Sequence, residues 1–592
     1  MKLNSKVICI AVLLITSPVF PAISLSPNQN SNSGNLPAGH SELHFFLSDG
    51  NWVKDLYLPN NANNLDSITI QSTAAYKSFL DTSNTSLPLE VMTIENGDTF
   101  KFIYDSKLKK WVLSLNTLTP TNNSQAELIT LKNNSKLHKI SLYDGKWAKK
   151  IILPSNVAHG TIVQVVSTAS YASEIGKDNL LFPSSYNLYN GSEYWFIYNK
   201  DLQKWIPEFI QPINLDVKDI GNFLNAVKAP LTQINFSDGN WVSDFILPTI
   251  ANDRDRIIIK STATWTAKIN NKNINSNATL KLNTGDKYEF MYVKDKNHWV
   301  LLSSPIKMIK SDHIIDSILP DMNQPVLKVN ISDSNWKKTI HLPKNAQIGD
   351  KVILSSTAKI NSFITAFSNL STQIREGETR RFIYTNQGWE IDSYTIDMLL
   401  VNSPDVSKIL GESAAKIRML EGLNLTNLTA ENSSAKFYLR QAGYLTYKIP
   451  AFTILDAIYN GRSNLVVQTE RKRLLANGVY YQGNEPGGGG CGWAWVNADD
   501  YNMIAANDIS GCSIAAMRHE VGHNLGIHHD DSSNIGSGFS HPLGSTALGG
   551  NDLNFYSSPY LYNPKYGVRL GVDGRKDAVS VINANAFKVS QY

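Results

Sequence analysis

One stretch, HEVGHNLGIHHD, carries the side chains of this sequence that are best suited to chemistry. His519 and His523 are four residues apart, so on a helix they project from one face. Glu520 adjoins the first of them and can act as a general base. Gly526 can end the helix in a left-handed turn, after which His529 offers a third nitrogen. Three protein ligands leave the fourth tetrahedral position to water, as in catalytic rather than structural zinc sites.

The alternative is a set of unrelated histidines on an amphipathic helix, because H-E-x-x-H alone recurs by chance. Here the glycine and the third histidine follow in register, and this extended motif favours a Zn²⁺ site. His528 adjoins the third ligand and competes with it, but the two-residue gap after Gly526 selects His529. We therefore expect His519, His523 and His529 to be the metal ligands.

The composition describes a folded protein of several domains, since 592 residues are too many for one core. Charged residues make up 18% and hydrophobic residues 42% of the chain. The net charge of +4 is too small to suggest binding to nucleic acid or to an anionic membrane. We expect no membrane span.

The N-terminus resembles a secretory signal. Lys2 and Lys6 precede the apolar run Val7–Ile15, and small and turn-forming residues follow through Ser24. The run is too short to span a bilayer. We therefore predict a secreted, extracellular protein.

Removal of the signal leaves two cysteines, Cys491 and Cys512. An isolated pair in an exported protein usually forms a disulfide. The bond would close a loop of about twenty residues and contribute roughly 3 kcal/mol through loop entropy. The alternative is two free thiols or soft metal ligands.

A pattern recurs four times before residue 393. Its first tryptophan returns every 94 or 95 residues, at Trp52, Trp147, Trp241 and Trp336. Four further landmarks follow each of these tryptophans in the same register: Leu-Pro, Ser-Thr-Ala, a Phe-x-Tyr strand and a second tryptophan. Alternation, β-branched residues and Gly/Asn/Asp turns indicate short antiparallel strands, so each copy should be a small β-sandwich or barrel.

Two interpretations of the repeats stay open. Eight tryptophans in exported β-modules suit sugar stacking or adhesion to a glycan or cell-surface ligand. Alternatively, the aromatic positions recur because every copy needs the same core, and the array is then a spacer or an inhibitory segment.

The pattern changes near Val401. Ser403 can cap a helix with Pro404 at its first position. Four apolar residues would lie on one side of that helix: Ile409, Leu410, Ile417 and Leu420. Strands are expected at 435–440, 478–482 and 491–497, with a glycine-rich loop at 485–490.

The sequence thus predicts a multidomain protein with four tandem all-β modules and a final α/β (α+β) domain. The expected parts are a signal peptide (1–24), a flexible leader (25–41), four β repeats (42–118, 131–212, 229–305 and 323–393) and a catalytic domain (398–592).

The C-terminal third resembles the metzincin zinc endopeptidases, most closely bacterial members similar to the reprolysin (ADAM-like) family. The resemblance rests on HEVGHNLGIHHD, on CGWAWVN upstream and on NFYSSP downstream. It implies a twisted mixed sheet above the zinc helix, with Ala494, Trp495 and Val496 at the sheet edge along which an extended substrate pairs. It also implies a structural hydrogen-bonding role for Asp530.

Metzincins carry a methionine in a turn below the metal, and this chain has none after Met517. Leu548 occupies the expected place and would form the apolar floor. His541 would be an ordinary loop residue, and Tyr556 would either line the specificity pocket or pack internally.

The predicted function is zinc-dependent hydrolysis of peptide bonds in extracellular proteins or glycoproteins, including a mucin-directed variant. Zinc would lower the pKa of its water toward 7, and Glu520 would take the proton and pass it to the leaving amine. The alternative is an adhesive repeat protein whose protease-like domain is secondary or inactive.

Overall fold

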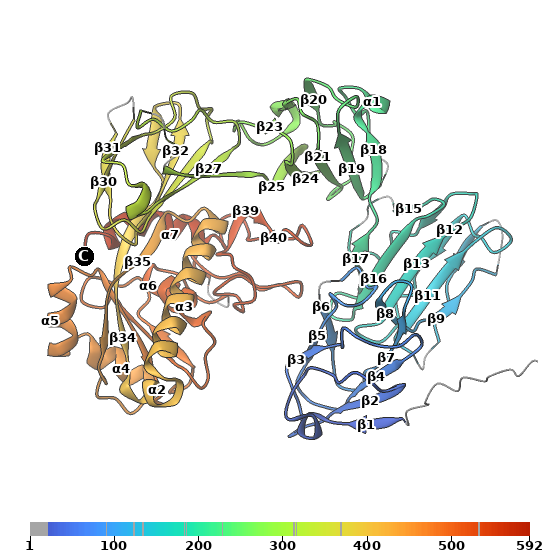
Figure 1. Cartoon of the computed structure of the whole chain (residues 1–592), viewed down its shortest axis with the longest axis horizontal. Coiled ribbons are helices and arrows are strands. Elements are labelled where there is room, and N and C mark those ends of the chain that lie inside the picture. The colour runs from blue at the N-terminus through green and yellow to red at the C-terminus, as the bar shows by residue number, and fades with distance from the viewer. Residues whose placement is uncertain are drawn as a thin grey trace, which may run out of the picture. The chain divides into compact units, whose positions relative to one another are not determined.

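The computed structural model describes residues 22–592 except positions 90, 122–124, 133–134, 183, 185, 228, 312–313, 315, 367–369 and 531–532. The predicted signal peptide therefore lies outside the described residues apart from its last three positions. The chain divides into two compact units, Met1–Gln211 and Pro212–Tyr592 (Figure 1). The first unit holds two β-sandwiches, and the second holds two more and the C-terminal domain.

Each repeat folds into two sheets, one of them five-stranded. The five-stranded sheets of the first unit are formed by β1 (Ile23–Leu25), β2 (Glu42–Leu47), β4 (Ser67–Ser72), β7 (Thr99–Asp105) and β8 (Lys110–Leu113), and by β9 (Asn116–Leu118), β11 (Leu137–Leu142), β13 (Ile162–Ser167), β16 (Glu193–Asn199) and β17 (Lys204–Ile210). The smaller sheets contain β3 (Asp55–Tyr57), β5 (Ser78–Asp81) and β6 (Val91–Ile94), and β10 (Ala126–Leu128), β12 (Lys150–Ile152), β14 (Ser173–Ile175) and β15 (Tyr186–Leu188).

The second unit repeats this arrangement. Its five-stranded sheets are formed by β18 (Ile213–Asp216), β19 (Leu231–Phe236), β21 (Arg256–Ser261), β24 (Lys287–Val293) and β25 (His298–Ser303), and by β26 (Ile306–Lys310), β27 (Val326–Ile331), β29 (Lys351–Ser356), β32 (Thr379–Thr385) and β33 (Gly388–Ile391). The smaller sheets contain β20 (Asp244–Ile246), β22 (Ala267–Asn270) and β23 (Lys281–Leu282), and β28 (Thr339–His341), β30 (Ser362–Thr365) and β31 (Ser371–Ile374).

The prediction of antiparallel strands is confirmed for part of each repeat and wrong for the rest. In the five-stranded sheet of each repeat the first three strands are parallel, as in β1, β2 and β4, and the last two pairings are antiparallel. The reason is connectivity: β3 follows β2 in the chain but pairs in the other sheet, so β4 returns to β2 in the same direction.

The segment predicted to be a flexible leader, 25–41, makes contacts with the first sandwich. β1 pairs with β2, and the backbone N–H of Asn28 donates to Oδ1 of Asn51 at 2.9 Å. Linker residues behave in the same way, since β9, β18 and β26 each form the edge strand of the following sandwich. The predicted first repeat, 42–118, thus ends with a strand that belongs to the second sandwich. An open sheet edge offers unpaired N–H and C=O groups, and the linkers satisfy them.

The second tryptophan of each repeat is a core residue. Its indole N–H donates to the carbonyl of the proline in the Leu-Pro landmark, at 2.7–2.9 Å. All four of these tryptophans are buried: Trp111, Trp205, Trp299 and Trp389. At these positions the recurrence reflects packing.

The C-terminal domain begins at Tyr394, four residues before the predicted boundary. Its sheet has the order β35 (Phe437–Thr446), β34 (Tyr394–Asn402), β36 (Gly478–Gly483), β38 (Ile504–Asp508) and β37 (Gly492–Ala494). Four strands are parallel, and the edge strand β37 is antiparallel to β38. A short hairpin follows, made by β39 (Ser558–Tyr562) and β40 (Arg569–Leu570).

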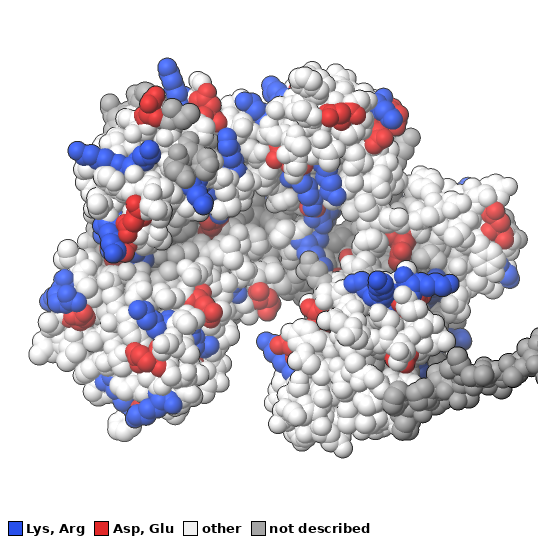
Figure 2. All heavy atoms as spheres, viewed as in Figure 1, with Lys and Arg blue, Asp and Glu red and all other residues white. Residues whose placement is uncertain are grey.

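Helices cover both faces of this sheet. One core packs the sheet against α3 (Glu412–Ser433), α6 (Ala516–Asn524) and α7 (Ala578–Val589). A second core lies on the other face, under α4 (Ile454–Gly461) and α5 (Leu465–Arg473). Among the described residues, no helix combines the length and the apolar character that crossing a membrane requires. The surface in Figure 2 is mostly uncharged, with basic and acidic side chains dispersed over it.

The predicted helix after Ser403 forms, but its predicted apolar face is wrong. The Ser403 hydroxyl accepts the N–H of Asp405 at the start of α2 (Pro404–Leu410), as expected. Gly411, with a φ of 83°, then separates α2 from α3. The face of α3 that packs inward is rich in small and polar residues, whereas most of the predicted face is exposed to solvent: Ile409, Leu410 and Ile417.

Candidate metal centre

Helix α6 brings the first two histidines of the motif together, and the turn after it returns the third. The turn needs a glycine, because Gly526 has a φ of 98° and a methyl group there would lie 2.8 Å from Nδ2 of Asn585. Nε2 of His529 lies 3.0 Å from Nε2 of His519 and 3.1 Å from Nε2 of His523. Three ring nitrogens thus converge on one point.

Backbone carbonyls fix the orientation of two of these rings. Nδ1 of His519 donates to the carbonyl of Ala547 at 2.8 Å, and Nδ1 of His523 donates to that of Ile527 at 2.6 Å. Their Nε2 lone pairs therefore face the convergence point. Burial lowers the pKa of His519 to about 4 and that of His523 to about 3, so both rings are neutral at neutral pH. Neutral rings held through Nδ1 with Nε2 turned inward fit a zinc ion.

Glu520 points toward the edge strand beside this point. Its side chain is only 5% exposed, and burial raises its pKa to about 8. A methyl group at Gly492, in β37, would collide with Oε1 of Glu520, so the strand passes directly against the carboxyl group. The arrangement suits proton transfer at a site from which water is largely excluded.

Cys491 and Cys512 form a disulfide with a Cα–Cα distance of 5.3 Å. Cys491 immediately precedes β37, and Cys512 lies in the turn before α6. The bond therefore ties the edge strand to the helix that carries two of the histidines.

The predicted substrate edge lies only partly in a strand. Ala494 is the last residue of β37, whereas Trp495 and Val496 follow it. The Trp495 carbonyl accepts the Asn524 side-chain N–H at 3.0 Å, so this segment continues along α6.

Leu548, which the sequence predicted as the apolar floor, packs against α6. It is buried, and a methyl group at Gly522 would lie 2.7 Å from its Cδ1. Tyr556 packs internally, because it is fully buried and its hydroxyl donates to the Arg518 carbonyl at 2.9 Å. Asp530 pairs with Lys576 at 2.9 Å.

His541 lies outside the histidine cluster, and its Nδ1 accepts the N–H of Leu543 at 3.1 Å. The sequence interpretation missed Arg518, which is buried beside His519. Its Nε donates to Oδ1 of Asn551 at 2.6 Å and anchors α6 to the loop that holds Leu548. The sequence signal for this role was a charged residue placed between the apolar Met517 and the histidine motif.

Comparison with known proteins identifies the repeats. The β-sandwich domain of the metalloprotease StcE matches four times, at residues 41–115, 135–209, 229–303 and 324–393. None of the curated proteins matches the chain. A solved StcE fragment from enterohemorrhagic E. coli is 19% identical over 14% of this chain and 87% of the fragment, with a TM-score of 0.13.

Another solved chain, from a structure described as a chaperone-substrate complex, is 65% identical to this one. The match covers 96% of this chain and 99% of that one, with a TM-score of 0.86. The present chain therefore belongs to the same family as that protein, and its four β-sandwich domains relate it to the metalloprotease StcE.

Proposed function

We propose that this protein is an exported zinc-dependent endopeptidase of metzincin type, most similar to reprolysins. His519, His523 and His529 would hold the metal, and Glu520 would be the general base. The convergence of the three Nε2 atoms beside a buried carboxyl group carries the proposal. Kinship with StcE, a metalloprotease, supports it.

A bound zinc ion supplies Lewis-acid chemistry at the peptide carbonyl and the attacking water. The carbonyls of Ala547 and Ile527 keep two ligand rings in the tautomer that can bind it. In its ionised form, Glu520 accepts the proton of the attacking water and delivers it to the leaving amine. A substrate strand added beyond β37 would pass Gly492, and its scissile bond would then lie near this carboxylate.

Glu520→Ala tests the proposal. The variant should fold and bind one zinc per chain, as the wild type should, while cleavage of casein or gelatin falls by at least about a hundredfold. A chelator should abolish wild-type cleavage and added zinc should restore it. Full activity of the variant would contradict the role of Glu520, and a wild-type protein without zinc would contradict the metal site.

We further propose that the repeats bind a glycan or cell-surface ligand on the protein or glycoprotein substrate. Equivalent positions of the first three repeats carry a highly exposed aromatic residue: Tyr76 (68%), Tyr171 (67%) and Trp265 (65%). In the first two repeats this ring lies 5.7 and 5.6 Å from the first tryptophan of the pattern. An exposed ring beside a partly buried tryptophan suits stacking on sugars.

Alanine at all three exposed positions should reduce cleavage of a large glycosylated substrate and leave cleavage of casein unchanged. If the variant cleaved both substrates at the wild-type rate, the repeats would be spacers rather than binding modules. The adhesive alternative predicts that surface binding persists with a chelator and that no cleavage accompanies it.

The 65% identical relative suggests a chaperone partnership for this chain as well. The other chain of that complex, mixed with the purified protein, should co-elute with it on gel filtration. Separate elution at micromolar concentration would contradict the partnership.

A further inference from the structure

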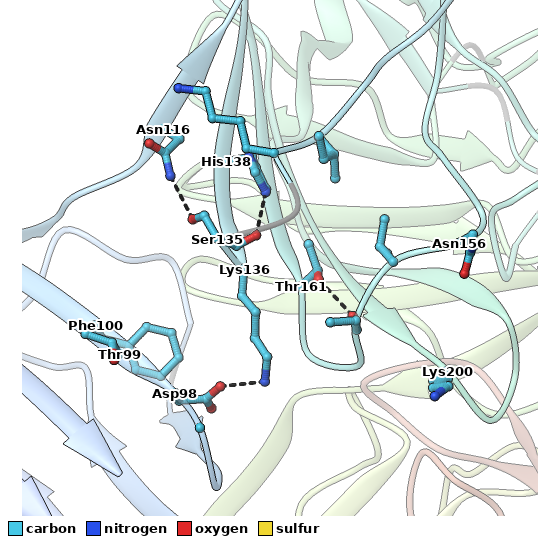
Figure 3. A pocket seen from close by; sticks show the side chains of 15 residues that line it. Asp98, Thr99, Phe100, Asn116, Ser135, Lys136, His138, Asn156, Thr161 and Lys200 are labelled. Atoms are coloured by element: carbon cyan, nitrogen blue, oxygen red, sulfur yellow. Dashed lines mark hydrogen bonds and ion pairs between the residues drawn. The ribbon is translucent and has the colours of Figure 1, made fainter. Parts of the chain in front are cut away.

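A cavity of about 890 Å³ lies between the first and second sandwiches, within the unit Met1–Gln211 (Figure 3). Its wall combines the turn before β7, residues 131–132 and 135–136 before β11, and the loop before β13. Hydroxyl and amide side chains share this wall with a few apolar ones. The volume is within the usual range for small-molecule sites.

The charged groups of the wall are unequal in number, with three lysines (Lys132, Lys136 and Lys200) and one aspartate (Asp98). Nζ of Lys136 pairs with Oδ1 of Asp98 at 2.5 Å, a contact drawn in Figure 3. Lys132 and Lys200 are exposed, and no ion pair joins either one to another described residue. His138 adds no charge, because burial lowers its pKa. The cavity therefore has excess positive charge.

The second sandwich lacks an acid that the other three possess. In those sandwiches the loop before the third strand ends in an aspartate, whose carboxylate accepts the N–H three residues earlier: Asp66, Asp255 and Asp350. The equivalent residue here is Thr161, which lines the cavity. Its hydroxyl donates to the Ala158 carbonyl at 2.7 Å.

The junction between sandwiches three and four shows what this acid does elsewhere. The Asp350 carboxylate accepts the backbone N–H of Thr279 at 2.7 Å and its hydroxyl at 2.8 Å, so it joins the two modules. Thr161 has no such charge, and at its junction a cavity bordered by lysines lies between the modules.

We propose that this cavity binds an oxyanion carried on a hydroxyl-rich molecule, such as the carboxylate or sulfate group of an acidic saccharide. The exposed ammonium group of Lys200 holds the anion, since Nζ of Lys136 is directed at Asp98 (Figure 3). Asn156 offers its amide group to the rest of the ligand, and Asn116 and Ser135, hydrogen-bonded to each other at 2.7 Å, line the same wall.

Calorimetric titration of the full chain with glucuronate, glucose 6-sulfate and neutral glucose tests the proposal. The two anionic sugars should bind, and glucose should bind at least about tenfold more weakly. Inorganic sulfate serves as a further arm. If it binds as tightly as the sugars, the oxyanion site stands and its ligand is a free ion.

Thr161→Asp is the decisive variant, because three sister modules already fold with aspartate at this position. It should keep the thermal midpoint and weaken anion binding at least about tenfold. Lys200→Glu should do the same from the exposed rim. Lys149→Glu, an exposed change outside the cavity wall, is the matched control. Unchanged binding in both cavity variants, or an equal loss in the control, would overturn the proposal.

Discussion

A single glycine sets the distance between the edge strand and the proposed general base. Gly492→Ala would place a methyl group against Oε1 of Glu520. Because a displacement of about 1 Å at a reacting group can cost 10²-fold in rate, we expect kcat/KM for a peptide substrate to fall about a hundredfold with zinc content unchanged.

Gly490→Ala is the control for this prediction. A methyl group there meets only ordinary contacts, the nearest at 3.5 Å, so activity should be retained. Equal losses in both variants would assign the effect to loop stiffness rather than to the contact with Glu520.

At this scale the sequence predicted the side chains and missed their supports. Three histidines and a glutamate are visible because residue type and offset define them. The carbonyls that orient His519 and His523 belong to Ala547 and Ile527, and a backbone carbonyl leaves no mark on residue type. The same holds for Gly492, whose importance arises only when a distant strand crosses α6.

Among the elements, the disulfide connects β37 to the turn before α6. A Cys491→Ser/Cys512→Ser protein should lose roughly 3 kcal/mol of unfolding free energy in urea, by the loop-entropy argument. It should also cleave casein more slowly, because the edge strand is no longer tied to the helix. Unchanged activity together with lower stability would limit the bond to a structural role.

Buried His138 in β11 should make the stability of the first unit depend on pH. Burial lowers its pKa below the free value of 6.5, so near that pH the unfolded chain binds a proton that the folded chain does not. Its stabilising contribution is therefore present above pH 6.5 and is lost as the pH falls toward the folded-state pKa.

His138→Gln removes this titration. Between about pH 7.5 and 5 its thermal midpoint should fall less than that of the wild type. Parallel curves for the two proteins would show that other groups govern the pH dependence.

Element prediction succeeded where local pattern and cap agreed, as at Ser403 and β36. It failed where a segment forms a strand or helix face only because of the element it packs against. β9, β18 and β26 lie in linkers and form strands because a sheet edge is open beside them. The predicted apolar face was wrong because Gly411 ends α2. The four apolar residues expected on one helix are therefore divided between α2 and α3.

Across the whole molecule, a buried arginine of the fourth sandwich forms an ion pair within that sandwich and also reaches the C-terminal domain. Arg381 is only 1% exposed. Its Nε lies 2.5 Å from Oδ2 of Asp392, and its Nη2 donates to the Ala435 carbonyl at 3.0 Å. Arg381→Met would leave the Asp392 carboxylate buried without this partner. We expect a loss of about 3–5 kcal/mol in the unfolding of the second unit.

Lys359→Met, a change of an exposed side chain in the same sandwich, is the control and should cost less than about 1 kcal/mol. Thermal unfolding followed by calorimetry measures both. If Arg381→Met were as mild as its control, the junction would not be a stabilising contact.

The Arg381 contact also constrains the order in which the parts of the chain fold. The sequence of the fourth sandwich is complete at residue 393, yet one acceptor for its guanidinium group arrives only with Ala435, beyond α3. A chain that is synthesised from its N-terminus therefore cannot form all contacts of the fourth sandwich before residue 435 has been added. The last sandwich makes this contact only once the first part of the C-terminal domain, through Ala435, has been synthesised and has folded against it.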